Sequence, residues 1–304
     1  MPTMLSALAP VFALIILGYA LKRAHVFPDT LWDGIEALVY WLLLPALLVV
    51  KLGNTDLSEF DVLPMAASMA GATVLVVLGL MVVRKIVGIE GPVYTSILQG
   101  GIRQNSYIGL AAAVPLYGVS GQALAAVGIA AVIPLVNVIS MWSLASLGPS
   151  GPPGIGVILK RLAKSPIIIA CAIGIGVNLA GTGIHALPAT TLDLLGRGAL
   201  PLGLLAVGAG LDFGIVKRSP IPLLFSNCLK LLAIPTLTAW FCHLQDVDPT
   251  TTGVAILFAS LPSSASSYVM ARQFGGDHEL MAAILTTQVM MAAVTIPLML
   301  GLFG

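Results

Sequence analysis

The chain has 304 residues, of which 58% are hydrophobic and 9% are charged. Soluble domains carry roughly 25% charged residues, so this composition excludes an ordinary soluble domain. The formal net charge is only +1, and the few Lys and Arg residues are scattered, which leaves no basic surface for nucleic acid. We therefore expect an all-α polytopic membrane protein whose surroundings are the lipid bilayer, with no nucleic-acid partner.

Ten apolar segments follow one another along the chain, each near the roughly 20 residues that a helix needs to cross a bilayer. All are expected to be helical, because irregular backbone facing lipid is not tolerated. Lys22 and Arg23 follow the first segment instead of preceding it, so we interpret it as a spanning helix and not as a signal peptide. The predicted spans are 4–21, 31–51, 63–83, 92–117, 122–146, 162–180, 189–211, 220–242, 252–274 and 280–302.

The two halves of the chain repeat each other. Five residue pairs share one offset of 156, and Tyr117-Gly118 matches Phe274-Gly275 at an offset of 157. Each half has five spans, an odd number, so the second copy must enter the membrane from the opposite side. This predicts two inverted five-helix repeats, at 1–147 and 162–304, joined by a linker at 148–161. The matched pairs are Pro10/Pro166, Gly18/Gly174, Pro45/Pro201, Asp56/Asp212 and Pro64/Pro220.

Basic residues are distributed unevenly between the two sets of alternate loops. One set holds ten of the fourteen Lys and Arg residues, the opposite set holds only Lys51, and three lie within spans. Since basic loops stay in the cytoplasm, we expect both termini on the periplasmic side of the inner membrane. The ten are Lys22, Arg23, Arg84, Lys85, Lys160, Arg161, Lys164, Lys217, Arg218 and Arg272.

The fourth span places glycines, amides and an arginine where hydrocarbon depth demands apolar residues, and its repeat mate in the ninth span is rich in serine. Pro262 falls opposite Asn105 under the offset of 157. Both spans therefore read as helices broken near mid-membrane. A break exposes free N–H groups that favour an anion and free carbonyls that need partners. Amides and hydroxyls at these breaks can complete an anion site, or can only cap the freed backbone. The candidates are Asn105, Ser106, Ser263, Ser264 and Ser266.

Two of the three cations within spans are candidate site residues. Arg103 lies at the first break. Its guanidinium can donate two parallel hydrogen bonds to a substrate carboxylate, or it can bond the free backbone carbonyls of the break. Lys230 in the eighth span can face the cavity or snorkel outward. Gln104 is a weaker candidate for substrate contact.

Other polar and proline positions predict local structure. Asp193 and Arg197 are spaced i to i+4 and should neutralise each other. Pro45 and Pro201 should kink their helices. Asp33 and Glu36, at the start of the second span, are expected to be hydrated.

No nucleotide-binding, metalloprotease or nucleophile-elbow motif is present, and the three cysteines have no paired spacing. We expect no enzymatic activity, no metal and no cofactor, with H⁺ and Na⁺ both open as coupling ions.

Four sequence segments resemble the auxin efflux carrier family, which includes bacterial malonate carriers: Pro10–Tyr19, Arg103–Gly109, Lys164–Ile169 and Leu261–Tyr268. The resemblance implies ten helices, with a scaffold of helices 1, 2, 6 and 7 and a transport domain in which broken helices 4 and 9 cross. It also implies homodimers, and a substrate carboxylate beside Asn105, Tyr107, Pro262 and Ser263. The Asn-Pro-Asn break of plant members is replaced here by Arg-Gln-Asn, which puts auxin itself in doubt.

The leading hypothesis is secondary transport of a small mono- or dicarboxylate through an elevator-like movement of the crossover. A sodium-coupled symporter of a larger amphipathic anion, similar to bile-acid symporters, is one alternative. A membrane sensor that binds its ligand without moving it is another. Uptake into sealed proteoliposomes separates the three.

Overall fold

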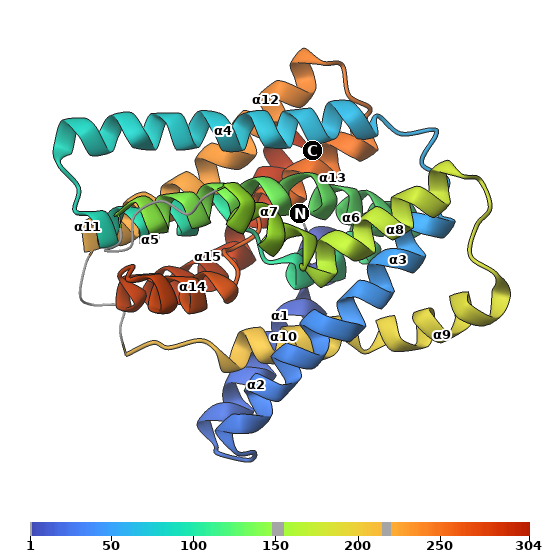
Figure 1. Ribbon diagram of the computed structural model, residues 1–304, viewed down its shortest axis with the longest axis horizontal. Coiled ribbons are helices and arrows are strands. Elements are labelled where there is room, and N and C mark those ends of the chain that lie inside the picture. The colour runs from blue at the N-terminus through green and yellow to red at the C-terminus, as the bar shows by residue number, and fades with distance from the viewer. Residues whose placement is uncertain (1, 148–154, 215–219) are drawn as a thin grey trace.

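The computed structural model describes residues 2–147, 155–214 and 220–304, and within these ranges the fold is entirely helical (Figure 1). The predicted basic positions Lys217 and Arg218, and the first half of the predicted linker, 148–154, lie outside the described residues. The helices are α1 (Pro2–Arg23), α2 (Asp29–Leu38), η1 (Val39–Leu43), α3 (Leu44–Asn54), α4 (Val62–Val87), α5 (Gly91–Ile102), α6 (Ser106–Leu147), α7 (Ile155–Ala163), α8 (Pro166–Leu179), α9 (Ala186–Arg197), α10 (Ala199–Ala209), α11 (Pro220–Cys228), η2 (Leu229–Ala233), α12 (Ile234–Leu244), α13 (Pro249–Ala259), α14 (Ser266–Phe274) and α15 (His278–Phe303).

Seven helical stretches in the described chain are long and apolar enough to cross a membrane. One of them, Gly91–Leu147, is 57 residues long and contains both the fourth and the fifth predicted spans. The shorter apolar helices α8 and α13 fall in the sixth and ninth predicted spans. Large apolar side chains are widely exposed, such as Leu63 and Leu179 at 80% and 82%, as lipid-facing helices require. The protein is therefore a polytopic membrane protein, and the count of ten spans stays a prediction.

Some predicted boundaries are wrong by several residues. The sixth span was predicted from 162, but α7 ends at Ala163 and α8 begins at Pro166. A proline fits the first turn of a helix, where its missing N–H is not needed, and so it marks a new start. The described part of the predicted linker, 155–161, is helical and belongs to α7.

Prolines interrupt the second and seventh predicted spans, as expected. Before Pro45 the helix widens into the π-turn η1, where Leu44 N–H donates to Val39 C=O. A proline lacks an N–H and its ring crowds the carbonyl one turn back, so the preceding turn loosens. The chain between α9 and α10 is interrupted at Gly198, just before Pro201.

Two helix pairs pack closely through glycine. In Figure 1, α3 lies beside α8 and α1 beside α10, and both pairs are in contact. A Cβ added at Gly18 of α1 would collide with the Leu205 carbonyl oxygen on α10. A Cβ at Gly174 of α8 would lie 2.8 Å from the Leu52 side chain and 3.2 Å from Val49 O on α3. Small residues of this kind let two helix backbones approach within a membrane.

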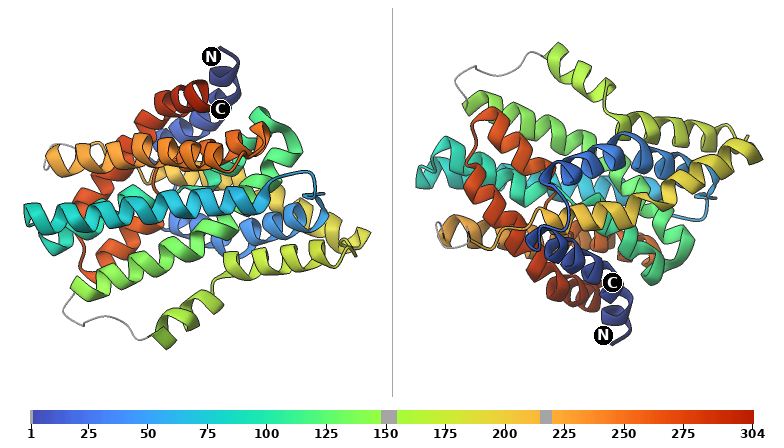
Figure 2. Two further views of the ribbon diagram at one scale, coloured as in Figure 1. Left: turned by 90° about the horizontal axis from the view of Figure 1, so that it is seen from above. Right: turned by 90° about the horizontal axis from the view of Figure 1, so that it is seen from below.

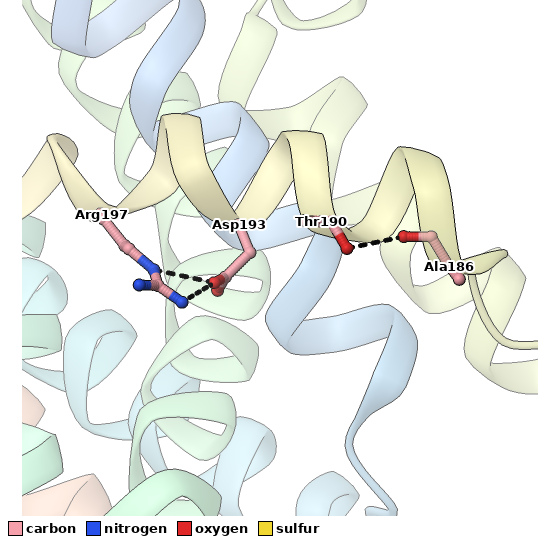
Figure 3. Close-up of polar contacts among 4 residues, drawn as sticks. All are labelled: Ala186, Thr190, Asp193 and Arg197. Carbon is pink, nitrogen blue, oxygen red and sulfur yellow. Dashed lines mark hydrogen bonds and ion pairs between the residues drawn. The ribbon is translucent and has the colours of Figure 1, made fainter.

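The predicted pairing of Asp193 with Arg197 is confirmed on α9, where a guanidinium nitrogen lies 2.8 Å from the carboxylate (Figure 3). One turn earlier, the Thr190 hydroxyl donates a hydrogen bond to the Ala186 carbonyl at 2.8 Å. The Arg197 side chain is 73% exposed, so the pair contributes little to stability.

The start of α1 and the end of α15 lie close together in both views of Figure 2, and the two helices are in contact.

Candidate substrate site

Both predicted helix breaks are present. After α5 the backbone at Arg103, Gln104 and Asn105 is not helical, and α6 begins at Ser106. After α13 the non-helical stretch 260–265 precedes α14. The half-helices after the two breaks both lead into a left-handed glycine, Gly118 with φ 70° and Gly275 with φ 77°.

The two breaks lie directly against each other. Asn105 N–H donates to the Pro262 carbonyl over 2.8 Å, which joins one break to the other through the backbone. The half-helix before one break packs against the half-helix after the other, α5 against α14 and α13 against α6. Gly109 makes this approach possible, because a Cβ there would lie 2.6 Å from Leu261 Cδ1. The broken helices therefore cross at their non-helical segments.

Asn105 and Ser263 face the backbone at the crossing. Asn105 Oδ1 accepts from the N–H groups of Tyr107 and Ile108 at 3.1 and 3.3 Å and so caps α6. Ser263 Oγ lies 3.5 Å from Gln99 O and 3.2 Å from Ser267 Oγ. Asn105, Pro262 and Ser263 are buried and do not line the cavity described below.

Gln288 of α15 supports both breaks and was missed by sequence reasoning. Its Oε1 accepts from Ser263 N–H at 2.8 Å, and its Nε2 donates to the Gly100 carbonyl at 3.0 Å. The side chain is fully buried. A polar residue inside the predicted span 280–302 was the available signal, since such residues at membrane depth are expensive and usually functional.

A cavity of about 530 Å³ lies beside the crossing. That volume is typical of small-molecule sites, which measure about 300–1,000 Å³. Six of the ten predicted site residues line it, namely Arg103, Gln104, Ser106, Tyr107, Ser264 and Ser266. Its wall also includes a face of α2 and η1, part of α6 around Asn137, the start of α8, and α14.

Arg103 is 8% exposed, and its guanidinium is held by neutral groups. It donates to Asn137 Oδ1 at 2.9 Å and to Ser266 Oγ at 2.8 Å, and it lies 3.2 Å from Met270 Sδ. Its Nε has no hydrogen-bond partner among the described residues. Both salt bridges found in the described chain lie elsewhere, at Lys22–Asp29 and Asp193–Arg197. The guanidinium thus lines the cavity without a carboxylate to neutralise it.

Lys230 does not line the cavity. Its side chain is fully buried in η2, and Nζ lies 3.2 Å from the carbonyl oxygen of Ala259, the last residue of α13. A cation at this end of a half-helix offsets the partial negative charge of its free carbonyls.

Glu36 is less exposed than the hydrated side chain that the sequence predicted. Asp33 is exposed, but Glu36 is only partly exposed, and both line the cavity. The signal in the sequence was the spacing of Asp33, Glu36 and Tyr40, which places all three on one face of a helix.

Helices suited to a bilayer, with two crossed breaks beside a cavity that contains Arg103, define the class of membrane transporters. The chain belongs to the auxin efflux carrier family, because residues 3–146 and 155–300 match the family described as "Membrane transport protein". It is 25% identical over 307 residues to a Rhizobium meliloti protein named "Putative malonate transporter", covering 94% of this chain and 92% of the relative. It is 24% identical to an "Uncharacterized transporter" of Methanothermobacter thermautotrophicus, covering 95% and 94% of the two chains.

Proposed function

We propose that this protein is a secondary transporter that carries a small mono- or dicarboxylate across the inner membrane. The observation that carries this proposal is the uncompensated Arg103 guanidinium, which is buried and lines a cavity of suitable size. A buried cation without a counter-ion is costly, and a bound carboxylate would neutralise it through two parallel hydrogen bonds.

The remaining cavity residues at the breaks suit the same ligand. Ser106 and Ser266 are the first residues of α6 and α14, so the positive ends of two half-helices border the cavity. Gln104, Tyr107 and Ser264 add neutral hydrogen-bonding groups. In this proposal Asn105, Pro262 and Ser263 hold the breaks together from behind, and Lys230 stabilises the end of α13.

The fold that we propose for this function is ten spans in two inverted five-helix repeats. Matched local structure supports it. Gly18 approaches Leu205, and Gly174 approaches Val49, so both members of this contact follow the offset of 156. Asp56 and Asp212, another matched pair, each accept the backbone N–H two residues on, from Ser58 and Gly214.

For the transport cycle we propose an elevator-like movement of the crossing against the scaffold, in a homodimer with periplasmic termini. The cavity is bordered by Asp33, Leu162, Ser165 and Gln273. All four are close in sequence to the basic segments that the charge rule places in the cytoplasm. In this orientation the structure represents the state that is open to the cytoplasm.

Malonate is the first substrate to test, because a relative is named for it. Purified protein in sealed proteoliposomes should accumulate labelled malonate or a related carboxylate under an imposed gradient of Na⁺ or of pH. Binding of every carboxylate without uptake would instead indicate a sensor. Uptake only of larger amphipathic anions with Na⁺ would favour the symporter alternative.

Arg103 provides the sharper test. Arg103→Lys keeps the charge but loses the planar fork, and Arg103→Gln loses both. We expect Arg103→Gln to weaken binding by about 1.5–3 kcal/mol, roughly ten- to a hundredfold, with Arg103→Lys between it and the parent. Arg197→Gln is the matched control, because this arginine is exposed and paired with Asp193. Unchanged affinity with lower thermal stability in the Arg103 variants would make this residue a scaffold group.

A further inference from the structure

One face of α2 and η1 lines the substrate cavity with acidic and phenolic side chains. Asp33, Glu36 and Tyr40 all border it, at spacings of three and four residues that keep them on one side of the helix. The crossing forms another part of the wall with Arg103 and Tyr107. The cavity therefore has carboxylates as well as the guanidinium that the proposed function assigns to the anion.

Glu36 has no salt-bridge partner among the described residues. Neither it nor Asp33 makes a hydrogen bond or salt bridge within the described residues, although Glu36 is partly buried. Asp29, at the start of the same helix, is paired with Lys22 at 2.6 Å and leaves no cation for Glu36. The structure therefore provides a partly buried carboxylate in the cavity that forms no salt bridge with another described residue.

The charges that face Glu36 are few. On its own helix there is Asp33, on η1 there is Tyr40, and the crossing contributes Arg103 and Tyr107. Helix α10, which packs against α2, has no titratable side chain. Of the helices that pack against η1, α8 has only Cys171, α9 has the mutually paired Asp193 and Arg197, and α3 has Lys51. Two carboxylates and one guanidinium give the described lining a formal charge of −1, which opposes entry of an anion.

From this geometry we propose that Glu36 is a proton-binding site linked to the substrate: it takes up one proton when the carboxylate binds beside Arg103. The inference rests on the proposed function, and it makes H⁺, rather than Na⁺, the ion whose binding accompanies the substrate. An arriving negative charge raises the cost of a second charge nearby in a poorly solvated cavity, and protonation of Glu36 removes that cost. Linkage is reciprocal, so the proton must strengthen anion binding as much as the anion strengthens proton binding.

Asp33 supplies a matched control on the same helical face. It is one turn away and exposed, so water can solvate its charge in both states. Malonate affinity is measured by calorimetry for the parent protein, Glu36→Gln and Asp33→Asn across a pH series. Protonation of malonate itself affects all three alike, so the difference between variants reports on the protein.

In the parent, affinity should fall with rising pH by up to about tenfold per pH unit, between the pKa of Glu36 in the free protein and its higher pKa in the complex, as uptake of one proton requires. Glu36→Gln should bind as tightly as the parent does at low pH and lose this slope, while Asp33→Asn keeps it. Calorimetry in two buffers of different ionisation enthalpy should show net proton uptake by the parent and by Asp33→Asn, and should show that this uptake is lost in Glu36→Gln. No uptake, or the same slope in Glu36→Gln, overturns the assignment while malonate binding continues to support the transporter. If the parent binds no carboxylate at any pH, the proposed function fails, and this inference with it.

Discussion

Gln288 and Gln99 are two fully buried glutamines at the crossing. They differ in whether their side-chain amides form hydrogen bonds, so comparing them measures how much the Gln288 bonds to the breaks contribute to stability. Gln288 bonds Ser263 N–H and the Gly100 carbonyl, whereas both side-chain polar atoms of Gln99 lack partners among the described residues. Methionine has a similar shape and no amide. Gln288→Met therefore leaves two buried backbone groups unsatisfied, and Gln99→Met leaves none.

Each buried group that loses its partner costs about 1–3 kcal/mol, so Gln288→Met should lower the free energy of unfolding by about 2–6 kcal/mol. Neither Ser263 nor Gly100 lines the cavity, so its water does not readily replace the lost bonds. Gln99→Met should be neutral or stabilising, because it removes an unpaired amide from the interior. Reversible unfolding of both variants in mixed detergent micelles measures the difference. Equal losses would refute the assignment of Gln288 as the residue that joins the two breaks.

Two further predictions concern the topology and the N-terminal cap of α13. In a cysteine-free background, a single cysteine in place of Ser58 should react with an impermeant maleimide added from the periplasm, and one in place of Lys85 only from the cytoplasm. The reverse pattern would show that the predicted topology is inverted. Asp248 caps α13 by accepting from Thr251 N–H at 2.9 Å, and it also accepts from Asp61 N–H at 3.3 Å. Burial raises the pKa of Asp248, but these hydrogen bonds outweigh burial and hold it below the ordinary value. Asp248→Ala should cost about 0.5–2 kcal/mol near neutral pH. Because the folded pKa is lowered, this contribution is lost as the pH falls below about 4, where parent and variant should converge in thermal melts; a constant difference would contradict the charged cap.

Hydropathy predicted the membrane class and the broken helices because both follow from local composition. A continuous lipid-facing helix does not contain Arg103, Gln104 and Asn105 in succession, so the break was visible in the sequence. The π-turns η1 and η2 were not predicted, since how a helix relaxes before a proline depends on its neighbours. Helix ends shifted by a few residues for the same reason.

The sequence indicated which residues lie near the cavity better than it indicated which of their side chains face it. Arg103, Ser106 and Ser266 do line the cavity. Asn105 accepts from a backbone N–H and Ser263 donates to a backbone carbonyl, because the crossing needs its own backbone groups satisfied before any ligand is bound. Which side chains face inward is fixed by contacts between α5, α6, α13 and α14, which are distant in sequence.

If Arg103 binds the substrate as proposed, its partners explain how the cation remains available to an anion. A permanent carboxylate partner would position the guanidinium but would also compete with the substrate. Asn137 and Ser266 position it without neutralising it, so its charge is available to a ligand. The two carboxylates of α2 line the same cavity without forming a salt bridge to Arg103. In the proposed coupling, their charge opposes the anion until a proton reduces it, so that one cavity links an anion to a proton.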